Sequence, residues 1–599
     1  MFERLKPLNP YLRRYWKSLA WGGVSTILYN VIKVLLPTVI GHAVDDMQHG
    51  ITQQKILYHG LRLLLIAALS AVFLYITRQV IIGASREIEF DLRNDLFSNL
   101  ERQAPIFYHT HRTGDIMART TNDLNAVRQL LGPAIMYSAN TIVFMAAALP
   151  FMYRISPKLT FFAFVPLPLA SVLVQYFGNL IHRRFERIQA MFSDISAKAQ
   201  ENFSGARLIR AFAQEEAEIA SFETANLEYI KRSLHLVRLM AMLWPTLEFV
   251  LGLSLMITLL VGGHEVVSHR ISVGQFTAFN VYMVQLTWPM IAVGWVVNLF
   301  QRGTASIVRI DELLKQQPAI ADDPALLQAD TSSLSSRSAA EGSAVITPAI
   351  TGDIEFRNLT FAYPNGPTVL HDINLRIPAG SSLAIVGPTG SGKSTLVNLI
   401  PRLQDAPPGS VLIDERPIRT FPLQTLRKNI GFIPQETFLF SDTIRQNIAF
   451  GTPDATSEQI EHAAKIAHIA TEIFEFPRGF DTMVGERGVT LSGGQKQRTS
   501  IARAVIRNPR ILILDDALAS VDTYTEERIL SGLHQVMEGR TTIFISHRIS
   551  TARNADQIAV LVAGRIAELG THDELLARNG YYTSLFEKQR LEEELSVAT

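Results

Sequence analysis

The stretch Gly387-Pro-Thr-Gly-Ser-Gly-Lys-Ser394 decides the fold of the C-terminal half of this 599-residue chain. It fits the pattern G-x-x-x-x-G-K-[ST], with the apolar, strand-like SSLAIV before it and the apolar, helix-like TLVNLI after it. Glycines in such a loop let backbone N–H groups approach phosphates, and the start of the following helix adds partial positive charge. We therefore predict a strand–loop–helix unit that binds a nucleotide. A chance Gly-rich turn would need neither the Lys-Ser pair nor these flanks.

Short apolar strands alternate with helices from about Gly352 onward, which indicates a parallel α/β sheet around this loop. Within it, Lys393 is expected to reach the β- and γ-phosphates, and the Ser394 hydroxyl is expected to bind Mg²⁺. The residues assigned to nucleotide binding in the loop are Gly387, Pro388, Thr389, Gly390, Ser391, Gly392, Lys393, Ser394 and Thr395.

Two more apolar, strand-like stretches end in polar residues. ILIL runs into Asp515 and Asp516, and TTIFIS runs into His547. We expect Asp515 to complete the Mg²⁺ shell and Asp516 to act as general base or to orient the attacking water. His547 is a candidate contact for the γ-phosphate, although a lone His is more often structural. Tyr363 follows the strand-like IEFRNLTFA, where it would stack on an adenine ring or simply pack in the core.

A second anion-binding pattern occurs downstream. The segment Leu491-Ser-Gly-Gly-Gln495 precedes the helix-like KQRTSIARAVI and presents a hydroxyl, glycine backbone and a helix N-terminus. Because the chain already contains a phosphate loop, the segment has two interpretations. Either it caps a helix in the ordinary way, or it binds the phosphates of a nucleotide held by another subunit.

The N-terminal half is rich in apolar segments long enough to cross a bilayer, which takes about 20 residues. Two long connections, 84–130 and 181–242, carry many Arg residues and alternate with three short connections. The positive-inside tendency therefore predicts that both long connections and both ends of this half face the cytoplasm. The six candidate spans are roughly 18–40, 58–83, 131–153, 158–180, 243–263 and 273–299.

The long connections do not have loop composition. They contain few Gly or Pro and many Glu, Arg, Gln, Ala and Leu, which favours helix. We interpret them as helical extensions of the spans that reverse near Thr113–Asp115 and Ala211–Gln214. Their tips are either solvated ends or docking elements for the C-terminal domain, and composition favours neither alternative.

Composition sets the broad class. The chain is 47% hydrophobic and 19% charged, against roughly 25% charged residues in typical soluble proteins. The net charge of +1 gives no field that favours nucleic acid, and the absence of cysteine excludes disulfides and thiol catalysis. A Ser-, Ala-, Asp- and Pro-rich stretch after Gln316 predicts a flexible linker. The predicted domains are an N-terminal cytoplasmic segment 1–17, a transmembrane domain 18–302, a linker 303–351, a nucleotide-binding domain 352–590 and a tail 591–599.

The motifs occur in an order that resembles the ATP-binding cassette of ABC transporters: GPTGSGKST, Gln435 in FIPQETFLF, LSGGQKQR, ILILDD and the SHR around His547. Six spans, with FYHTHRTGDIMARTTNDLNAVRQLLG and ENFSGARLIRAFAQEEAEIASF in the connections, resemble a multidrug-resistance-like exporter half-transporter. The resemblance covers nearly the whole chain. It implies a membrane α-helical bundle of six transmembrane helices fused to an α/β P-loop NTPase cassette, with ATP and Mg²⁺ as cofactors.

The resemblance also implies roles for single residues. Tyr363 would stack on adenine, and Asp522 would lie at the seam of a cassette dimer. Gln435 would join Ser394 and Asp515 around Mg²⁺ and link the lytic water to the transmembrane part, so the catalytic set is Asp516, His547 and Gln435. The signature that completes a partner's ATP site would consist of Leu491, Ser492, Gly493, Gly494 and Gln495.

Asp516 departs from the family pattern, which usually has Glu at this position. Asp is one C–C bond shorter, and misplacing a catalytic group by about 1 Å can cost about 10²-fold in rate. In ALASVD, Ala519 and Ser520 also stand where Ser and Ala are usual. This variant resembles one partner of bacterial heterodimeric multidrug exporters, so we favour a second, different half-transporter over a homodimer. The retained His547 fits the alternative, a slower but working site.

The predicted function is ATP-driven export of lipophilic or amphipathic, drug-like molecules across the cytoplasmic membrane by a dimer, with lipid or peptide cargo left open. An ATP-gated channel, a membrane regulator or a lipid flippase would use the same cassette. No nucleic-acid partner is expected. Ionisable and aromatic residues in the spans are candidates for the cargo cavity, with helix packing or an interfacial aromatic belt as the alternative. They are Lys33, Trp244, Glu248, Tyr282, Gln285 and Trp288.

Overall fold

The computed structural model describes residues 2–323, 350–364, 366–485, 491–517, 523–546 and 548–598. The chain forms two compact units. The first comprises Met1–Arg102 and His111–Gln316, and the second comprises Gln103–Thr110 and Gln317–Thr599. The short segment Gln103–Thr110 thus belongs to the C-terminal unit, although the helices on both sides of it in sequence belong to the first unit.

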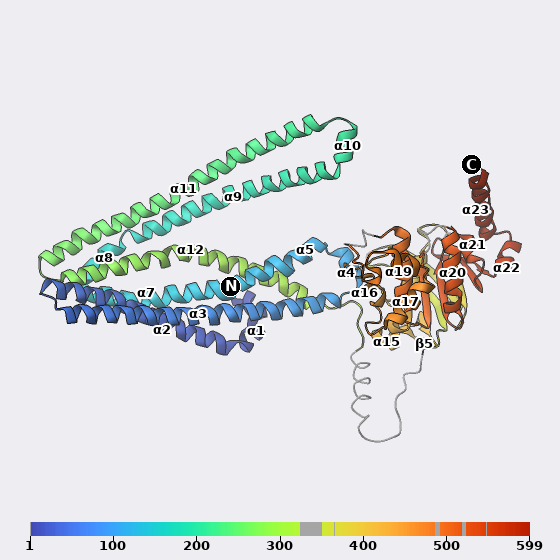
Figure 1. Ribbon diagram of the computed structural model, residues 1–599, viewed down its shortest axis with the longest axis horizontal. Coiled ribbons are helices and arrows are strands. Elements are labelled where there is room, and N and C mark those ends of the chain that lie inside the picture. The colour runs from blue at the N-terminus through green and yellow to red at the C-terminus, as the bar shows by residue number, and fades with distance from the viewer. Residues whose placement is uncertain are drawn as a thin grey trace, which may run out of the picture. The chain divides into compact units, whose positions relative to one another are not determined.

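The first unit is helical throughout (Figure 1). Helices α5, α6 and α7 follow one another without a break, because the π-helical turns η2 and η3 connect them. The elements are η1 Phe2–Leu8, α1 Asn9–Arg14, α2 Trp16–Gln48, α3 Gln53–Glu101, α5 Thr113–Ala118, η2 Arg119–Asp123, α6 Leu124–Gln129, η3 Leu130–Ala134, α7 Ile135–Ile155, α8 Pro157–Phe164, α9 Leu167–Ser204, α10 Ala206–Ala211, α11 Glu215–Val267 and α12 Val273–Lys315.

Four helical stretches in the described residues are long and apolar enough to cross a membrane. They are Trp16–Gln48, Gln53–Glu101, Thr113–Ile155 and Glu215–Val267, and they contain four of the six predicted spans. The other two predicted spans are 158–180, which lies in helices α8 and α9, and 273–299, which lies in α12. The structure does not describe some of the side chains in α9 and α12.

The two long connections are helical hairpins. The first reverses through α4 (Pro105–Thr110), a few residues before the predicted Thr113–Asp115, because α5 already begins at Thr113. The second reverses through α10 and the following three residues, 212–214, in agreement with the expected position. Helices α9 and α11 pack along each other up to α10 (Figure 1).

Helices extend into the predicted linker, which the sequence suggested was irregular, and into the predicted tail. Helix α12 continues to Lys315, so residues 303–315 of the predicted linker are helical. Helix α23 (Tyr581–Ala598) runs through the predicted tail 591–599 as far as Ala598. The irregular stretch after α12 is anchored to the second unit, because Asp322 Oδ1 accepts a hydrogen bond from the Leu423 backbone N–H at 2.9 Å. The central part of the predicted linker, 324–349, lies outside the described residues.

The second unit is built on two sheets. The larger has the order β10-β9-β3-β8-β7-β6, and β6, β7, β8, β3 and β9 are parallel, as predicted, with β10 antiparallel at one edge. The smaller, with the order β2-β1-β4-β5, is antiparallel. The strands are β1 Ile354–Ala362, β2 Thr368–Ile377, β3 Ser382–Val386, β4 Val411–Ile413, β5 Arg416–Pro417, β6 Ile430–Ile433, β7 Ile511–Asp515, β8 Thr541–Ile545, β9 Gln557–Val562 and β10 Arg565–Gly570.

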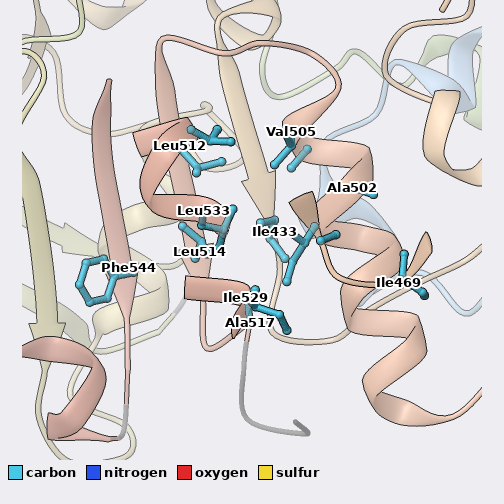
Figure 2. Close-up of a cluster of buried hydrophobic side chains, with 14 of the residues drawn as sticks. Ile433, Ile469, Ala502, Val505, Leu512, Leu514, Ala517, Ile529, Leu533 and Phe544 are labelled. Atoms are coloured by element: carbon cyan, nitrogen blue, oxygen red, sulfur yellow. The ribbon is translucent and has the colours of Figure 1, made fainter. Parts of the chain in front are cut away.

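Helices cover the larger sheet. On one face, strand residues such as Ile433, Leu514 and Phe544 pack with Val505 and Leu533 from helices (Figure 2). The opposite face packs against the smaller sheet. The helices are α14 Lys393–Asn398, η5 Ile418–Thr420, α15 Leu423–Lys428, α16 Ile444–Ala449, α17 Ser457–Ile466, α18 Ala470–Glu475, η6 Gly479–Asp481, α19 Gly493–Val505, α20 Thr523–Met537, α21 Ile549–Ala552, α22 His572–Ala577 and α23.

Candidate functional site

The candidate nucleotide site lies where parallel strands of the larger sheet end. Strand β8 lies between β3 and β7, so the segments after these three strands meet at one edge. The predicted phosphate loop follows β3, and Asp515 is the last residue of β7, paired with Ile545 of β8. Ligand sites in open α/β sheets lie at this edge.

Two glycines allow the phosphate loop to pass close to its neighbours. Gly387 has φ +147°, and a Cβ there would lie 2.1 Å from the carbonyl oxygen of Leu561. Gly392, at the start of α14, has φ +99°, and a Cβ there would lie 2.8 Å from Leu370 Cδ2. Only glycine fits such positions without strain, so the sequence pattern has a steric cause.

Lys393 is held inside the loop that it belongs to. Its side chain is buried, and Nζ donates hydrogen bonds to the carbonyl oxygens of Gly387 and Pro388, each at 2.9 Å. Burial lowers the pKa of Lys393, while the negative charges of Asp516 and Asp515 oppose that shift. A buried ammonium surrounded by carbonyl oxygens is positioned to pair with an entering phosphate.

The oxygen atoms beside the loop fit a magnesium ion. Ser394 Oγ donates a hydrogen bond to Asp515 Oδ1 at 2.8 Å, and Asp515 is only 4% exposed. Mg²⁺ prefers oxygen ligands, and in nucleotide sites it is held by one or two protein groups together with substrate phosphates. Ser391 Oγ is also buried and has no hydrogen-bond partner among the described residues, as expected of a hydroxyl that serves a ligand. The hydroxyl of Ser394 and the carboxylate of Asp515 are therefore suitable ligands for Mg²⁺.

Asp516 has an unusual backbone. Its φ is +49°, in the left-handed region that Asp tolerates better than most residues. Its N–H donates to the carbonyl oxygen of Ile545 at 3.2 Å, which fixes it beside the end of β8. Asp516 is half-buried, and its negative charge partly opposes the lowering of the Lys393 pKa by burial. Asp516 therefore lies at the same edge of the sheet as the phosphate loop and Asp515.

Of the four remaining predicted site residues, two lie among the described residues and two do not. The Tyr363 hydroxyl lies 3.1 Å from Thr395 Oγ1, and its ring packs edge-on against Phe361. This brings Tyr363 to the phosphate-loop helix and fits both adenine stacking and ordinary packing. Gln435 is exposed two residues beyond Ile433, whose partner in β7 is Leu514. His547 and Asp522 lie outside the described residues.

The signature segment begins helix α19 and faces outward. Ser492 Oγ accepts a hydrogen bond from the Gln495 backbone N–H, and Gln495 Oε1 accepts one from the Ser492 N–H, which is a complete capping box. Ser492 and Gly493 are exposed, whereas Leu491 is buried. The cap interpretation is thus realised, and it leaves the helix N-terminus open to a second phosphate group.

Glu472 of α18 supports this segment from behind and was missed by the sequence reasoning. It accepts hydrogen bonds from Gln495 Nε2 at 2.9 Å and from Arg498 in a two-point contact. Burial raises the pKa of Glu472, but the hydrogen bonds from Arg498 and Gln495 outweigh it and lower the pKa overall. No motif marks an acidic residue on a short helix more than twenty residues upstream, so only the three-dimensional contact reveals it.

The six cargo-cavity candidates do not share one environment. Lys33 lines a cavity between α2 and α3. Tyr282 is fully buried, with its hydroxyl donating to the Val34 carbonyl oxygen at 2.7 Å, which is the packing alternative. Gln285 is half-buried, and the Trp288 side chain lies outside the description. On α11, one turn apart, Trp244 and Glu248 are both exposed.

Comparisons with known proteins cover both units. The ABC transporter transmembrane region family matches residues 19–290, and the ABC transporter family of ATP-binding domains matches residues 370–519. The probable multidrug resistance ABC transporter ATP-binding/permease protein YheI of Bacillus subtilis is 36% identical over 597 residues, covering 99% of this chain and 98% of that protein. The multidrug resistance-like ATP-binding protein MdlA of Escherichia coli is 36% identical over 594 residues, covering 99% and 97%.

Solved structures agree with these matches. A bacterial Atm1-family ABC exporter with ATP bound superposes with a TM-score of 0.74 at 28% identity, covering 96% of this chain and 98% of the other. The fold class and family predicted from the sequence are confirmed, and with them ATP hydrolysis coupled to export by a dimer in a membrane. The chain belongs to the ABC transporter family, with the transmembrane region and the ATP-binding cassette of an exporter in one polypeptide.

Proposed function

We propose that this chain exports lipophilic or amphipathic molecules across the cytoplasmic membrane, with its cassette in the cytoplasm. The names of two relatives refer to multidrug resistance, and a third, from Syntrophus aciditrophicus, is an ATP-dependent lipid A-core flippase, 34% identical over 599 residues, covering 99% of this chain and 95% of that protein. The Arg-rich long hairpins support a cytoplasmic position for the α4 and α10 ends. The observation that carries the proposal is the contact between Ser394 and Asp515 beside a buried Lys393, on a chain whose other half is membrane-spanning helix.

In the proposed site, Lys393 binds the β- and γ-phosphates, and the loop backbone and Ser391 hold the remaining phosphate oxygens. Ser394, Asp515 and Gln435 would hold Mg²⁺, which neutralises charge on the β- and γ-phosphates when bound. Asp516 orients the attacking water and accepts its proton. His547 and Tyr363 are assigned to the γ-phosphate and the adenine ring.

The signature segment is proposed to act on a nucleotide held by a second chain. Ser492 and Gly493 are exposed, and Glu472 fixes the helix behind them by bonds that do not involve the phosphate loop. Each chain therefore supplies its phosphate loop to one nucleotide and its signature segment to the nucleotide held by its partner. Asp522 is assigned to the seam between the two cassettes.

Two exposed apolar surfaces, one in each unit, suggest how closure of the cassettes moves the membrane helices. The tip of the α9–α11 hairpin exposes Phe203, Leu208 and Phe212, with Phe203 81% exposed. On the cassette, Phe438, Phe440 and Phe450 are exposed and packed on one another. Burial of such apolar surface drives association. We assign the hairpin tip of each chain to the aromatic patch on its partner's cassette.

The partner is proposed to be a different half-transporter, because Asp516 stands where the family usually has Glu. A partner with Glu at the matching position would provide one fast site, completed by the intact signature of this chain. Co-purification from the native membrane tests this directly. A second cassette chain in equal amount supports the heterodimer, and recovery of this chain alone, active as a homodimer, contradicts it.

Reconstitution tests the export function itself. In vesicles with the cassette outward, ATP should drive a lipophilic fluorescent dye into the lumen against its gradient. The second candidate, an ATP-gated channel, is favoured by the same cassette but would let the dye equilibrate and stop. Accumulation above the outside concentration therefore separates the two functions.

A further inference from the structure

The membrane-spanning half contains a cavity between α2 and α3 that the nucleotide site does not explain. Its volume is about 240 Å³, and its lining is almost entirely apolar. From α2 come Tyr29, Lys33 and Leu36, spaced to share one helix face, and from α3 come Ile66, Ser70 and Leu74, also on one face. One cation is thus placed in an apolar groove.

Lys33 lies deep in the predicted span. It is seven residues before the end of the span at Ile40, which corresponds to about 10 Å along the helix. A charge in this position is costly and is retained where it has a function. No Asp or Glu occurs in residues 16–44, 58–86 or 135–155, so the helices around the groove offer no counter-charge.

The immediate surroundings of Lys33 confirm that its charge is not neutralised by an acid. Nζ lies 5.5 Å from the ring centroid of Tyr29 and 5.4 Å from that of Phe144, at cation–π distance. Within the described part of the chain it has no ion pair or hydrogen bond. An ammonium has three N–H donors, and aromatic faces do not satisfy them as an anionic oxygen does.

A second polar atom points to the same ligand. Ser70 lines the groove, and its Oγ is buried and has no hydrogen-bond partner in the described residues. Buried polar atoms without partners are uncommon and call for an explanation. A hydroxyl donor and an ammonium in one otherwise apolar groove are complementary to an anionic head group.

We propose that the Lys33 groove binds the anionic head of an amphiphilic cargo molecule, one with a carboxylate or phosphate at one end and an apolar body. This inference rests on the proposed export function and specifies its cargo class. The cavity is smaller than the roughly 300–1,000 Å³ of drug-sized pockets, so it holds one end of such a molecule. The apolar body starts along the apolar side chains that line the groove, Leu36 on α2 and Ile66, Ala71 and Leu74 on α3.

The depth of Lys33 favours cargo over a resident lipid. A bilayer phospholipid keeps its head group at the interface, whereas this ammonium lies about 10 Å inside the predicted span. A molecule with its anionic end at Lys33 has therefore left the position of an ordinary lipid, as a transported molecule must.

The test uses full-length protein in phosphatidylcholine nanodiscs without nucleotide. The probes are a dansyl-labelled undecanoic acid and its methyl ester, which differ in charge at one end. The wild type should bind the acid about tenfold more tightly than the ester. Lys33→Met should remove this preference while leaving ester binding unchanged, and Lys33→Arg should keep it. Ser70→Ala should weaken acid binding about threefold.

A matched control is available on the same helix. Lys17→Met makes the same chemical change at an exposed position of α2 outside the groove, and it should keep the full preference for the acid. Equal binding of acid and ester by the wild type, or an acid preference that survives Lys33→Met, overturns the proposal. Retained ester binding by the Met variant shows that it is folded.

Two further measurements separate the alternatives. If phosphatidylglycerol in the nanodisc displaces the acid from the wild type, the occupant is a resident anionic lipid and the assignment to cargo is wrong. In vesicles, ATP should drive movement of the acid by the wild type. A chain that retains the acid preference but moves no probe with ATP contradicts the proposed export function rather than the groove.

Discussion

The loop Gly387–Ser394 and the segment Leu491–Gln495 both lie at helix N-termini and are both proposed to bind phosphates, but they have opposite surroundings. In the loop, Lys393 is 6% exposed, and Ser394 donates a hydrogen bond to Asp515 at the end of β7. In the signature segment, Ser492 is exposed and is braced only from behind. The loop is thus complete within one chain, whereas the signature segment is shaped for something outside it. The difference is what a nucleotide shared by two chains requires.

The largest expected effect comes from the buried half of the site. Lys393→Ala removes the ammonium that faces the β- and γ-phosphates, and ATP turnover should fall by about 10²-fold or more. Turnover is measured by phosphate release from purified protein in nanodiscs. The control, Lys428→Ala, removes an exposed lysine of α15 and should leave turnover unchanged. Full turnover by the Lys393 variant would remove the loop from the mechanism.

Ser492→Asp tests whether the exposed half is more than a helix cap. Asp caps helices about as well as Ser, so a purely structural role predicts little change. A negative charge beside a partner's phosphates instead predicts a loss of turnover of about 10- to 100-fold. Ser492→Asn, a neutral cap, serves as the control for folding and should lose much less.

If the chain also assembles with itself, mixing of two variants shows which chain Ser492 serves. A dimer of one Lys393→Ala chain and one Ser492→Asp chain places both defects in a single composite site and leaves the other site intact. Turnover should therefore recover to about half of the wild type. No recovery in mixed dimers would mean that Lys393 and Ser492 of one chain serve the same nucleotide.

Glu472→Gln should have a smaller effect, because it loosens the signature helix without touching a phosphate. Loss of one charge from the contact with Arg498 is expected to lower turnover about three- to tenfold, mainly through a higher KM for ATP. The hydrogen bonds from Arg498 and Gln495 hold the pKa of Glu472 below its ordinary value of 4.5. Its contribution is therefore complete above pH 4.5 and is lost only as pH falls through the lower folded pKa.

The pH dependence provides the check. Because Glu472 stays ionised from pH 6 to pH 8, the ratio of wild-type to variant turnover should be constant over this range. Gln495→Ala, which removes the hydrogen bond to Glu472 together with the one from the Ser492 N–H, should also lower turnover. A ratio that changes between pH 6 and pH 8 would contradict the assigned charge.

The sequence predicted that the loop lies between a strand and a helix and that Asp515 ends a strand, because both patterns are local to one stretch of the chain. It did not reveal Glu472, since the contact with Gln495 depends on how α18 packs against α19. In the helical half, hydrophobicity located the spans, but it did not distinguish the fully buried Tyr282 from Lys33, which lines a groove. The predicted linker began at residue 303, whereas helix α12 continues to Lys315, so the irregular segment starts later than predicted. Side-chain direction within a bundle is set by tertiary packing, which no local pattern contains.

The smallest expected effect concerns Asp516. In the proposed site it would act on a water that lies between the phosphate loop of this chain and the signature segment of its partner. Asp516→Glu extends the carboxylate by one C–C bond toward that water, so turnover should stay equal or rise up to about threefold. The gain is limited because the backbone has φ +49°, which Glu accepts less readily than Asp. Asp516→Asn keeps the length and the backbone preference but removes the base, and its turnover should fall about 10²-fold or more. A sharp drop in the Glu variant, with the Asn variant unchanged, would mean that the carboxylate of Asp516 does not face the attacking water.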